Sequence, residues 1–178
     1  MIRIYVGLAL TLASSSACEA AGKQGSQVAT DTFMVFSRGY EFAPEVRSVL
    51  QVARQLADSA GSQITTAHLI IGVLSSPGNS GLAALRTLPI NLASLDSSLR
   101  ALPALPAAHA GSYSRDAQRA LESAMQEATS MKRPQLTAAD LLIGAVSRGG
   151  EKVQEILKTQ HVASEAVRAA TRRGASGA

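Results

Sequence analysis

The chain has 178 residues, of which 46% are hydrophobic and only 3% aromatic, with no tryptophan, and its formal net charge is +4. This length suffices for one ordinary domain with a hydrophobic core and is too short for two large domains. The aliphatic and alanine-rich composition favours packed helices, and the mild cationic excess without a stripe of Lys and Arg argues against nucleic-acid binding.

Residues 1–17 have the layout of a secretory signal peptide. An apolar run at 4–13, too short to span a bilayer, is followed by small residues and Cys18, the only cysteine. Cys18 stands where a bacterial lipoprotein carries its lipid anchor, although such signals usually have Leu where this chain has Ser15. Plain secretion and a mistaken start codon are the alternatives. We expect an exported or membrane-tethered lipoprotein with Cys18 lipidated if the signal is genuine, and a cytoplasmic protein otherwise; the membrane is contacted only through this anchor.

The rest of the chain divides into a tether and two similar copies. Residues 18–39 are mostly small and polar and are predicted to form a flexible tether. The first copy covers 40–102 and the second 113–174, with a proline-containing connector at 103–112 between them and a short tail at 175–178.

The internal repeat is visible when the sequence is compared with itself at an offset of 71 residues. The apolar positions of the first long periodic segment follow one helix face, and six of seven counterparts remain apolar in the second copy. With one further residue inserted, 65–72 falls on 137–144, and both segments carry a threonine near their start and a glycine at their end. The two segments share an apolar helix face, a threonine near the helix start and a glycine, and together these features predict two copies of one structural unit.

Each copy is predicted to contain four helices, which makes the chain an all-α protein of two tandem pseudo-symmetric four-helix repeats. The second helix of each copy is apolar almost all round, as a central buried helix should be. Gly72 and Gly144 inside these two helices cost helix propensity, so we expect them to allow the close approach of a neighbouring helix. The predicted helices cover 44–60, 66–75, 80–88 and 92–101 in the first copy and 115–131, 138–147, 151–159 and 163–173 in the second.

The motif and the helix order together resemble the double Clp amino-terminal domain of ClpA- and ClpC-type unfoldases. The clearest match is ITTAHLIIGVL at 64–74, with a weaker copy at 136–146 and with the two openings at 42–45 and 113–116. The resemblance covers roughly residues 40–173. It implies an all-α recognition domain that binds clients and adaptors.

The sequence departs from this family at the positions that matter for one known chemistry. In ClpC-type domains the Glu of each Gly-Thr-Glu-His motif, with a nearby Thr, binds phosphoarginine, since a carboxylate accepts two N–H bonds from a guanidinium. The matching Glu positions are Ala67 and Ala139, and the opening Thr is Ala43 in the first copy and Ser114 in the second. We therefore expect that either the client differs or this site has decayed.

No catalytic or cofactor-binding pattern is present in the sequence. There is no G-x-x-x-x-G-K-[ST] phosphate loop, no G-x-S-x-G elbow and no metal-ligand spacing. His68 matches the histidine of the family motif and is expected to be structural, while His109 and His161 are expected to be solvated. We therefore expect no cofactor, no metal and no enzymatic activity, and a recognition domain that stands alone without ATPase modules.

The predicted function is that of a non-catalytic protein- or peptide-binding module. Its partner would be a protein or peptide client, or a Clp unfoldase or peptidase; the alternative is an accessory subunit that docks on a Clp-type protease complex. A groove between the two halves would suit a peptide or a partner helix. The helix N-termini could attract an anionic group through their N–H donors, or their threonines could only cap their own helices. The candidate binding residues are Thr65, Thr66, His68, Ser114, Thr137 and Asp140, the last of which would complete a capping box with Thr137.

Overall fold

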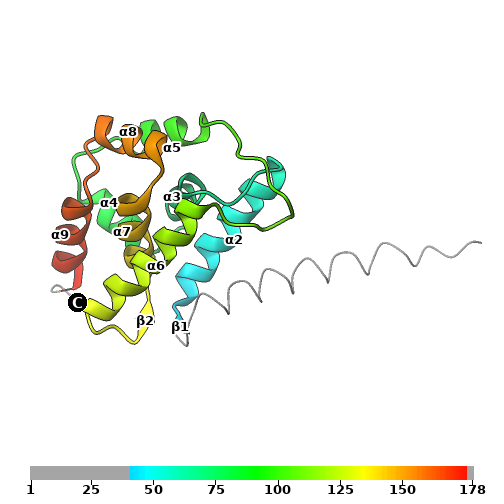
Figure 1. Cartoon of the computed structure of the whole chain (residues 1–178). Coiled ribbons are helices and arrows are strands. Elements are labelled where there is room, and N and C mark those ends of the chain that lie inside the picture. The colour runs from blue at the N-terminus through cyan, green and yellow to red at the C-terminus, as the bar shows by residue number, and fades with distance from the viewer. Residues whose placement is uncertain (1–40, 176–178) are drawn as a thin grey trace, which may run out of the picture.

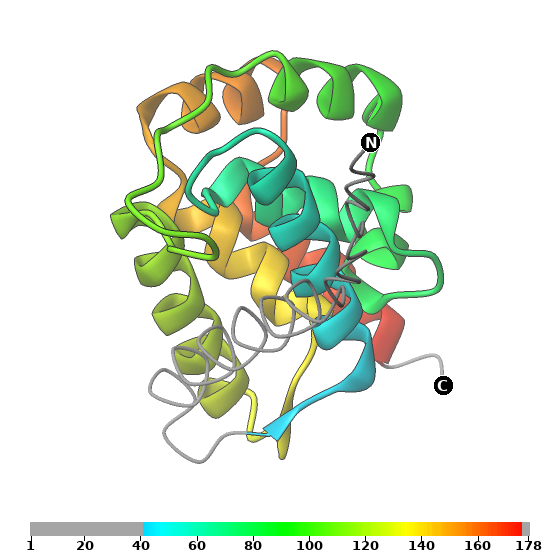
Figure 2. The same ribbon diagram turned by 90° about the vertical axis from the view of Figure 1, so that its right-hand side faces the viewer.

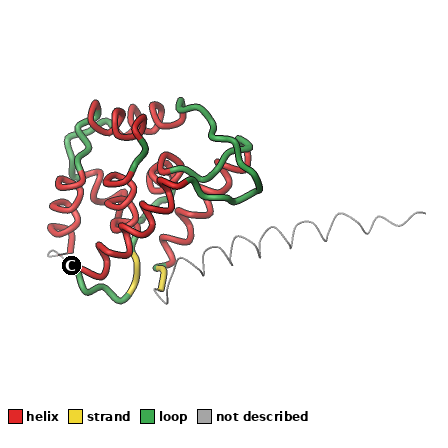
Figure 3. The backbone as a smooth tube through the Cα atoms, viewed as in Figure 1, coloured by secondary structure: helices red, strands yellow, loops and turns green. Residues whose placement is uncertain are grey.

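A computed structural model describes residues 41–175 of the chain. The predicted signal segment, the tether with Cys18 and the last three residues lie outside the described residues. The all-α prediction is confirmed: all eight predicted helices are present within this range, each with bounds within two residues of those expected (Figures 1 and 3). None of these helices is long and apolar enough to cross a bilayer.

The two copies contribute the same order of four helices, and each also has one two-residue strand, which precedes the first helix in one copy and the second helix in the other. The first copy contains β1 (Glu41–Phe42), α2 (Pro44–Ser59), α3 (Thr66–Ser75), α4 (Ser80–Arg86) and α5 (Leu92–Arg100), and the second contains α6 (Arg115–Ser130), β2 (Gln135–Leu136), α7 (Ala138–Arg148), α8 (Glu151–Thr159) and α9 (Ser164–Ala175).

The two strands belong to different copies and pair with each other. β1, which precedes the first helix of one copy, pairs in parallel with β2, which precedes the second helix of the other, so that Phe42 lies opposite Leu136 (Figure 2). The counterpart of this pairing is a parallel bridge between Ile64 and Tyr113. Each opening segment is therefore held by the opposite copy, which gives the fold a pseudo-two-fold arrangement.

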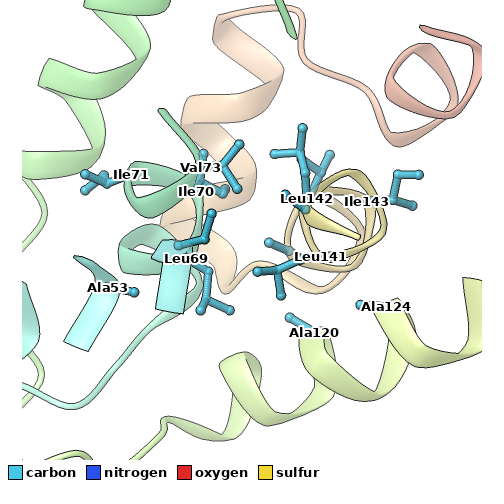
Figure 4. Packing of buried hydrophobic residues seen from close by; sticks show 14 of the residues in the cluster. Ala53, Leu69, Ile70, Ile71, Val73, Ala120, Ala124, Leu141, Leu142 and Ile143 are labelled. Atoms are coloured by element: carbon cyan, nitrogen blue, oxygen red, sulfur yellow. The ribbon is translucent and has the colours of Figure 1, made fainter. Parts of the chain in front are cut away.

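The core is built around the two central helices, α3 and α7, which pack against each other. Leu69, Ile70, Leu141 and Leu142 are fully buried. Figure 4 shows Leu69 and Leu141 in the space between the two helices, while Ile71 points to the other side of α3. The apolar faces of the two halves therefore pack against each other and their side chains fill this space. As a result, the groove expected between the halves does not open along α3 and α7.

The glycines of the central helices allow the first helix of each copy to approach closely, as predicted. A Cβ atom at Gly72 would lie 2.5 Å from the carbonyl oxygen of Val49 in α2. A Cβ atom at Gly144 would collide with the carbonyl oxygen of Ala120 and lie 2.8 Å from the nitrogen of Ala124, both in α6. The two positions are related by the repeat, and both need the absence of a side chain.

The outer helices also pack across the copies. α4 of the first copy lies against α9 of the second, and α5 lies against α8, at the top of the molecule in Figure 1. One contact breaks the symmetry: α4 also packs closely against α7, whereas its counterpart α8 makes no comparable contact with α3. The start of α7 is therefore covered by a helix that the start of α3 lacks.

Candidate functional site

The start of α3 is closed by a capping box of Thr65 and His68. Thr65 is the N-cap and accepts a hydrogen bond from the backbone nitrogen of His68, while its own backbone N–H donates to His68 Nδ1 over 3.1 Å. Because Nδ1 accepts this bond, the neutral imidazole carries its proton on Nε2. Burial lowers the pKa of His68, and a hydrogen bond with the backbone of Gln63 opposes this effect.

The start of α7 has the same cap with a carboxylate in place of the imidazole. Asp140 Oδ2 accepts the Thr137 backbone N–H at 3.0 Å and the Thr137 hydroxyl at 2.7 Å. Its other oxygen, Oδ1, accepts from Arg133 Nη1 at 2.7 Å, and Asp140 is completely buried. The predicted capping box is thus present, and Arg133 compensates the charge that it buries.

A second carboxylate seals the α7 start from outside. Glu45 of α2 accepts hydrogen bonds from the backbone N–H of Ala138 at 2.8 Å and from the backbone N–H of Ser80 at 2.8 Å. The Ser80 hydroxyl donates to Glu45 at 2.6 Å, and the backbone N–H of Ala139 is directed to that hydroxyl at 3.1 Å. One side chain therefore caps α4 and α7 together, and Ser80 completes the cover.

The corresponding donors of α3 have no such cover. The backbone N–H groups of Thr66 and Ala67, which correspond to Ala138 and Ala139, have no acceptor within the part of the chain that the structure describes. Ser114 lies next to this corner, because its backbone N–H donates to the Ile64 carbonyl at 2.9 Å, and its hydroxyl caps α6. The structure thus groups Thr65, Thr66, His68 and Ser114 at one corner and Thr137 and Asp140 at the other.

A cavity of about 250 Å³ opens beside the α3 start. Its walls come from the end of α2, the first turns of α3, the end of α5 and the beginning of the connector. Eight of the twelve lining residues are apolar, and the polar ones are few and lie among them. The lining residues are Leu56, Ser59, Ala60, Thr65, Ala67, His68, Ile71, Leu99, Arg100, Leu102, Pro103 and Ala104.

The matching corner of the second copy carries an ion pair instead. Glu127 of α6 occupies the position of Leu56 and receives Arg168 of α9 at 2.9 Å. The hydrogen bond with Glu127 raises the pKa of the Arg168 guanidinium. Arg168 also pairs with Glu165 at 2.6 Å. Where the first copy offers an apolar wall between its first and fourth helices, the second copy has a charged link.

Two of the residues that shape these corners were not predicted. Glu45 and Arg133 act on helix starts that lie far away in the sequence or outside the repeat pattern, so the motif alone does not indicate them. The carboxylate of Glu45 in the first turn after Pro44 was the available signal. Arg100 and the connector residues of the cavity were also missed, because the connector was predicted only as a spacer.

The described residues contain no cluster of three or more His, Cys, Asp or Glu side chains that could hold a metal ion. What the geometry defines is a pseudo-symmetric helical double repeat with one corner sealed by polar caps and the other open beside an apolar cavity. Residues 41–160 match the family described as the Clp repeat (R) N-terminal domain, and the chain belongs to this family. The resemblance inferred from the sequence is confirmed.

Solved structures with the same fold support the assignment. The chain is similar to the N-terminal domain of the Hsp104 protein of Candida albicans, with a TM-score of 0.61, 14% identity, and coverage of 74% of this chain and 89% of that one. It is similar to the N-domain of ClpV from Vibrio cholerae (TM-score 0.58, 12% identity, 67% and 77% covered). It is also similar to the N-terminal domain of the chaperone ClpD from Arabidopsis thaliana (0.56, 14%, 76% and 95%). At these identities the likeness concerns the fold alone. No curated protein matches the chain.

Proposed function

We propose that the chain is a non-catalytic module that binds segments of other proteins, and that it binds them at the cavity beside the start of α3. The family to which it belongs binds substrates and adaptors in Clp unfoldases. The observation that carries the proposal is the cavity itself: a concave, mostly apolar space with a few polar groups at its edge is the usual form of a ligand site.

The size and walls of the cavity indicate what it can accept. Its volume of about 250 Å³ is slightly below the range of about 300–1,000 Å³ that is typical of small-molecule pockets. One apolar side chain fits this space, whereas a whole helix does not. Leu56, Ile71 and Leu99 supply the apolar contacts from three different helices, so the site depends on the tertiary structure of the first copy.

The proposal is tested with an array of overlapping peptides from unfolded model proteins, probed with the labelled chain. Leu56 lines the cavity and packs partly buried against the core, so Leu56→Glu places a charge in the cavity wall, and circular dichroism first checks that the variant folds like the parent chain. We expect it to weaken binding at least about tenfold, the value of one lost side-chain anchor of about 1.4 kcal/mol. Gln51→Glu, on the exposed face of the same helix, is the matched control and should bind like the parent chain.

An array pattern that is identical for the parent and Leu56→Glu would contradict the proposal. Recovery of a stoichiometric peptidase from the native host, bound equally well by Leu56→Glu, would favour the accessory-subunit role instead. Absence of peptide binding by the parent chain would remove the binding function at this site.

We also propose that residues 1–17 direct export and that Cys18 becomes the lipidated first residue. The support is the order of the apolar run, the small residues and the cysteine in the sequence. Mass spectrometry of the amino terminus from the native host, with membrane fractionation, tests this. A diacylated chain beginning at Cys18 is the expected result, and an intact chain in the cytosol would overturn it.

A further inference from the structure

The connector between the copies is an extended segment paired to the first copy. Ser62 and Pro106 form an antiparallel bridge, with the Gln63 N–H donating to the Leu105 carbonyl at 2.7 Å and the Ala107 N–H donating to the Gly61 carbonyl at 3.3 Å. On its other side, the segment 61–64 pairs with the second copy through Ile64 and Tyr113. The segment at 61–64 is therefore central, and the connector forms the outer edge of a small ribbon.

The outer edge of the connector carries unpaired backbone groups. The N–H and the carbonyl of Leu105 both point inward, to Ser62 and Gln63. In an extended chain the groups of the neighbouring residues point the opposite way. The N–H and carbonyl of Ala104 and the carbonyl of Pro106 therefore face outward, both residues are exposed, and none of these groups has a partner among residues 41–175.

This edge is continuous with the cavity, because Pro103 and Ala104 line it. We propose that the two form one site, at which an extended segment of a partner protein pairs with Ala104 and places one aliphatic side chain in the cavity. This inference rests on the function proposed above and adds the mode of binding. Main-chain hydrogen bonds from a strand edge supply affinity, and a pocket for one side chain supplies specificity.

The charge of the site selects among such segments. Arg100 is the only lining residue with a full charge at neutral pH, and its side chain is 44% exposed. Its partner Asp96, at 2.7 Å, does not line the cavity, and no carboxylate does. An acidic residue next to the aliphatic anchor would complement Arg100. The occupant is therefore an extended acidic segment with one aliphatic anchor.

The prolines set the length of the pairing. Pro103 and Pro106 have no N–H, so Ala104 is the one outward donor in the segment 103–106. Prolines on an edge also hinder the addition of a long strand or of a second copy of the same chain. The site thus suits a short segment that forms few backbone hydrogen bonds and depends on its anchor.

The test measures binding of the full chain to the fluorescein-labelled peptide Ser-Thr-Glu-Leu-Glu-Thr-Ser by fluorescence polarisation. Three altered peptides replace Leu by Ala, replace both Glu by Lys, or carry N-methyl groups on the two residues that flank Leu. Ala104→Pro removes the outward N–H, and Ala104→Gly is the matched control that keeps it. We expect about tenfold weaker binding for the N-methylated peptide and for Ala104→Pro, as the loss of one or two backbone hydrogen bonds predicts.

The peptide with Ala in place of Leu should also bind about tenfold more weakly, and the Lys peptide should bind more weakly than the parent peptide at low salt. Equal binding of the N-methylated and parent peptides, with binding still lost in Leu56→Glu, would overturn strand pairing and leave the proposed function standing. Equal or tighter binding of the Lys peptide would overturn the acidic partner. Failure of all four peptides, while the peptide array remains positive and sensitive to Leu56→Glu, would overturn this inference alone.

Discussion

The starts of α3 and α7 occupy equivalent places in the two copies and meet opposite surroundings. At α7, Asp140, Arg133 and Glu45 satisfy the helix start with charged hydrogen bonds, and α4 covers it. At α3, a neutral histidine replaces the aspartate, and an apolar cavity lies alongside. A repeat that preserves its apolar faces keeps its fold, and it can therefore change the polar residues at its helix ends freely. Under the proposed function, the second copy contributes a sealed support and the first contributes the surface for binding.

The largest expected effect concerns the contact that both copies share. Gly144→Ala should lower the free energy of unfolding by about 3 kcal/mol, because its Cβ meets backbone atoms of α6 that cannot move separately. Gly72→Ala should cost about 2 kcal/mol, since one of its close contacts is the side chain of Val49. Urea unfolding followed by circular dichroism measures both.

The control for this pair is Gly61→Ala. Gly61 has open space around it but a φ of +57°, and Lys132 adopts a φ of 53° at the matching place in the second copy. This substitution should cost about 1 kcal/mol through backbone strain alone. If both helix-glycine variants were as stable as the control, the close approach of the helices would not be required for the fold.

The two capping boxes should contribute differently to the free energy of unfolding. Asp140→Ala should destabilise the protein by about 2.5 kcal/mol, because it removes a fully buried carboxylate and leaves Arg133 without that partner. His68→Ala should cost about 1 kcal/mol, the usual value of a cap interaction. Thermal or urea unfolding of the two variants gives the difference, and Asp58→Ala, at a half-exposed pair, serves as a control with an effect below about 0.5 kcal/mol. Equal losses at Asp140 and His68 would remove the energetic contrast between the corners.

The hydrogen bonds by which Glu45 caps α4 and α7 are tested by replacing Glu45. Glu45→Ala should cost about 2 kcal/mol, since it leaves the first N–H groups of two helices without their acceptor. Asp116, its counterpart in α6, makes no hydrogen bond of this kind among the described residues, so Asp116→Ala should change stability by less than about 0.5 kcal/mol. Amide hydrogen exchange at Ala138 and Ser80 locates the effect. Slow exchange at both sites in Glu45→Ala would show that other groups seal this corner.

The smallest effect is a dependence on pH. Burial lowers the pKa of His68 below its ordinary value of 6.5, so the unfolded chain binds this proton more readily than the folded one. Stability from the neutral imidazole is therefore complete above pH 6.5 and declines as the pH falls toward the lowered pKa. A proton on Nδ1 would also replace the acceptor of the Thr65 N–H by a donor. The difference in unfolding free energy between the parent and His68→Asn, measured from pH 7.5 to 5, should shrink; a constant difference would contradict this.

The helices and their repeat could be predicted from the sequence because they depend on local periodicity and on caps. The buried face of α2 and the threonines at 65 and 137 contain this information directly. The seal by Glu45 could not be predicted, since it joins residues 93 positions apart in the chain. The connector was expected to be a spacer because its prolines indicate only an extended chain, and its pairing with Ser62 depends on tertiary structure. The difference between the two corners could be predicted only in part: the sequence shows Leu56 replaced by Glu127 at the equivalent position, but not that Glu127 pairs with Arg168 or that Leu56 borders a cavity.

The exchange of opening segments between the copies has a consequence for how the chain folds. Phe42 finds its partner at Leu136 and Ile64 finds its partner at Tyr113, so neither copy can complete its own edge before the other is in place. We therefore expect the native state to form cooperatively across a long stretch of chain, and to fold more slowly than a bundle that has only local contacts. A fragment that stops in the connector would remain unstructured alone and gain helix only when the remaining half is added, as two separate chains that fold upon meeting.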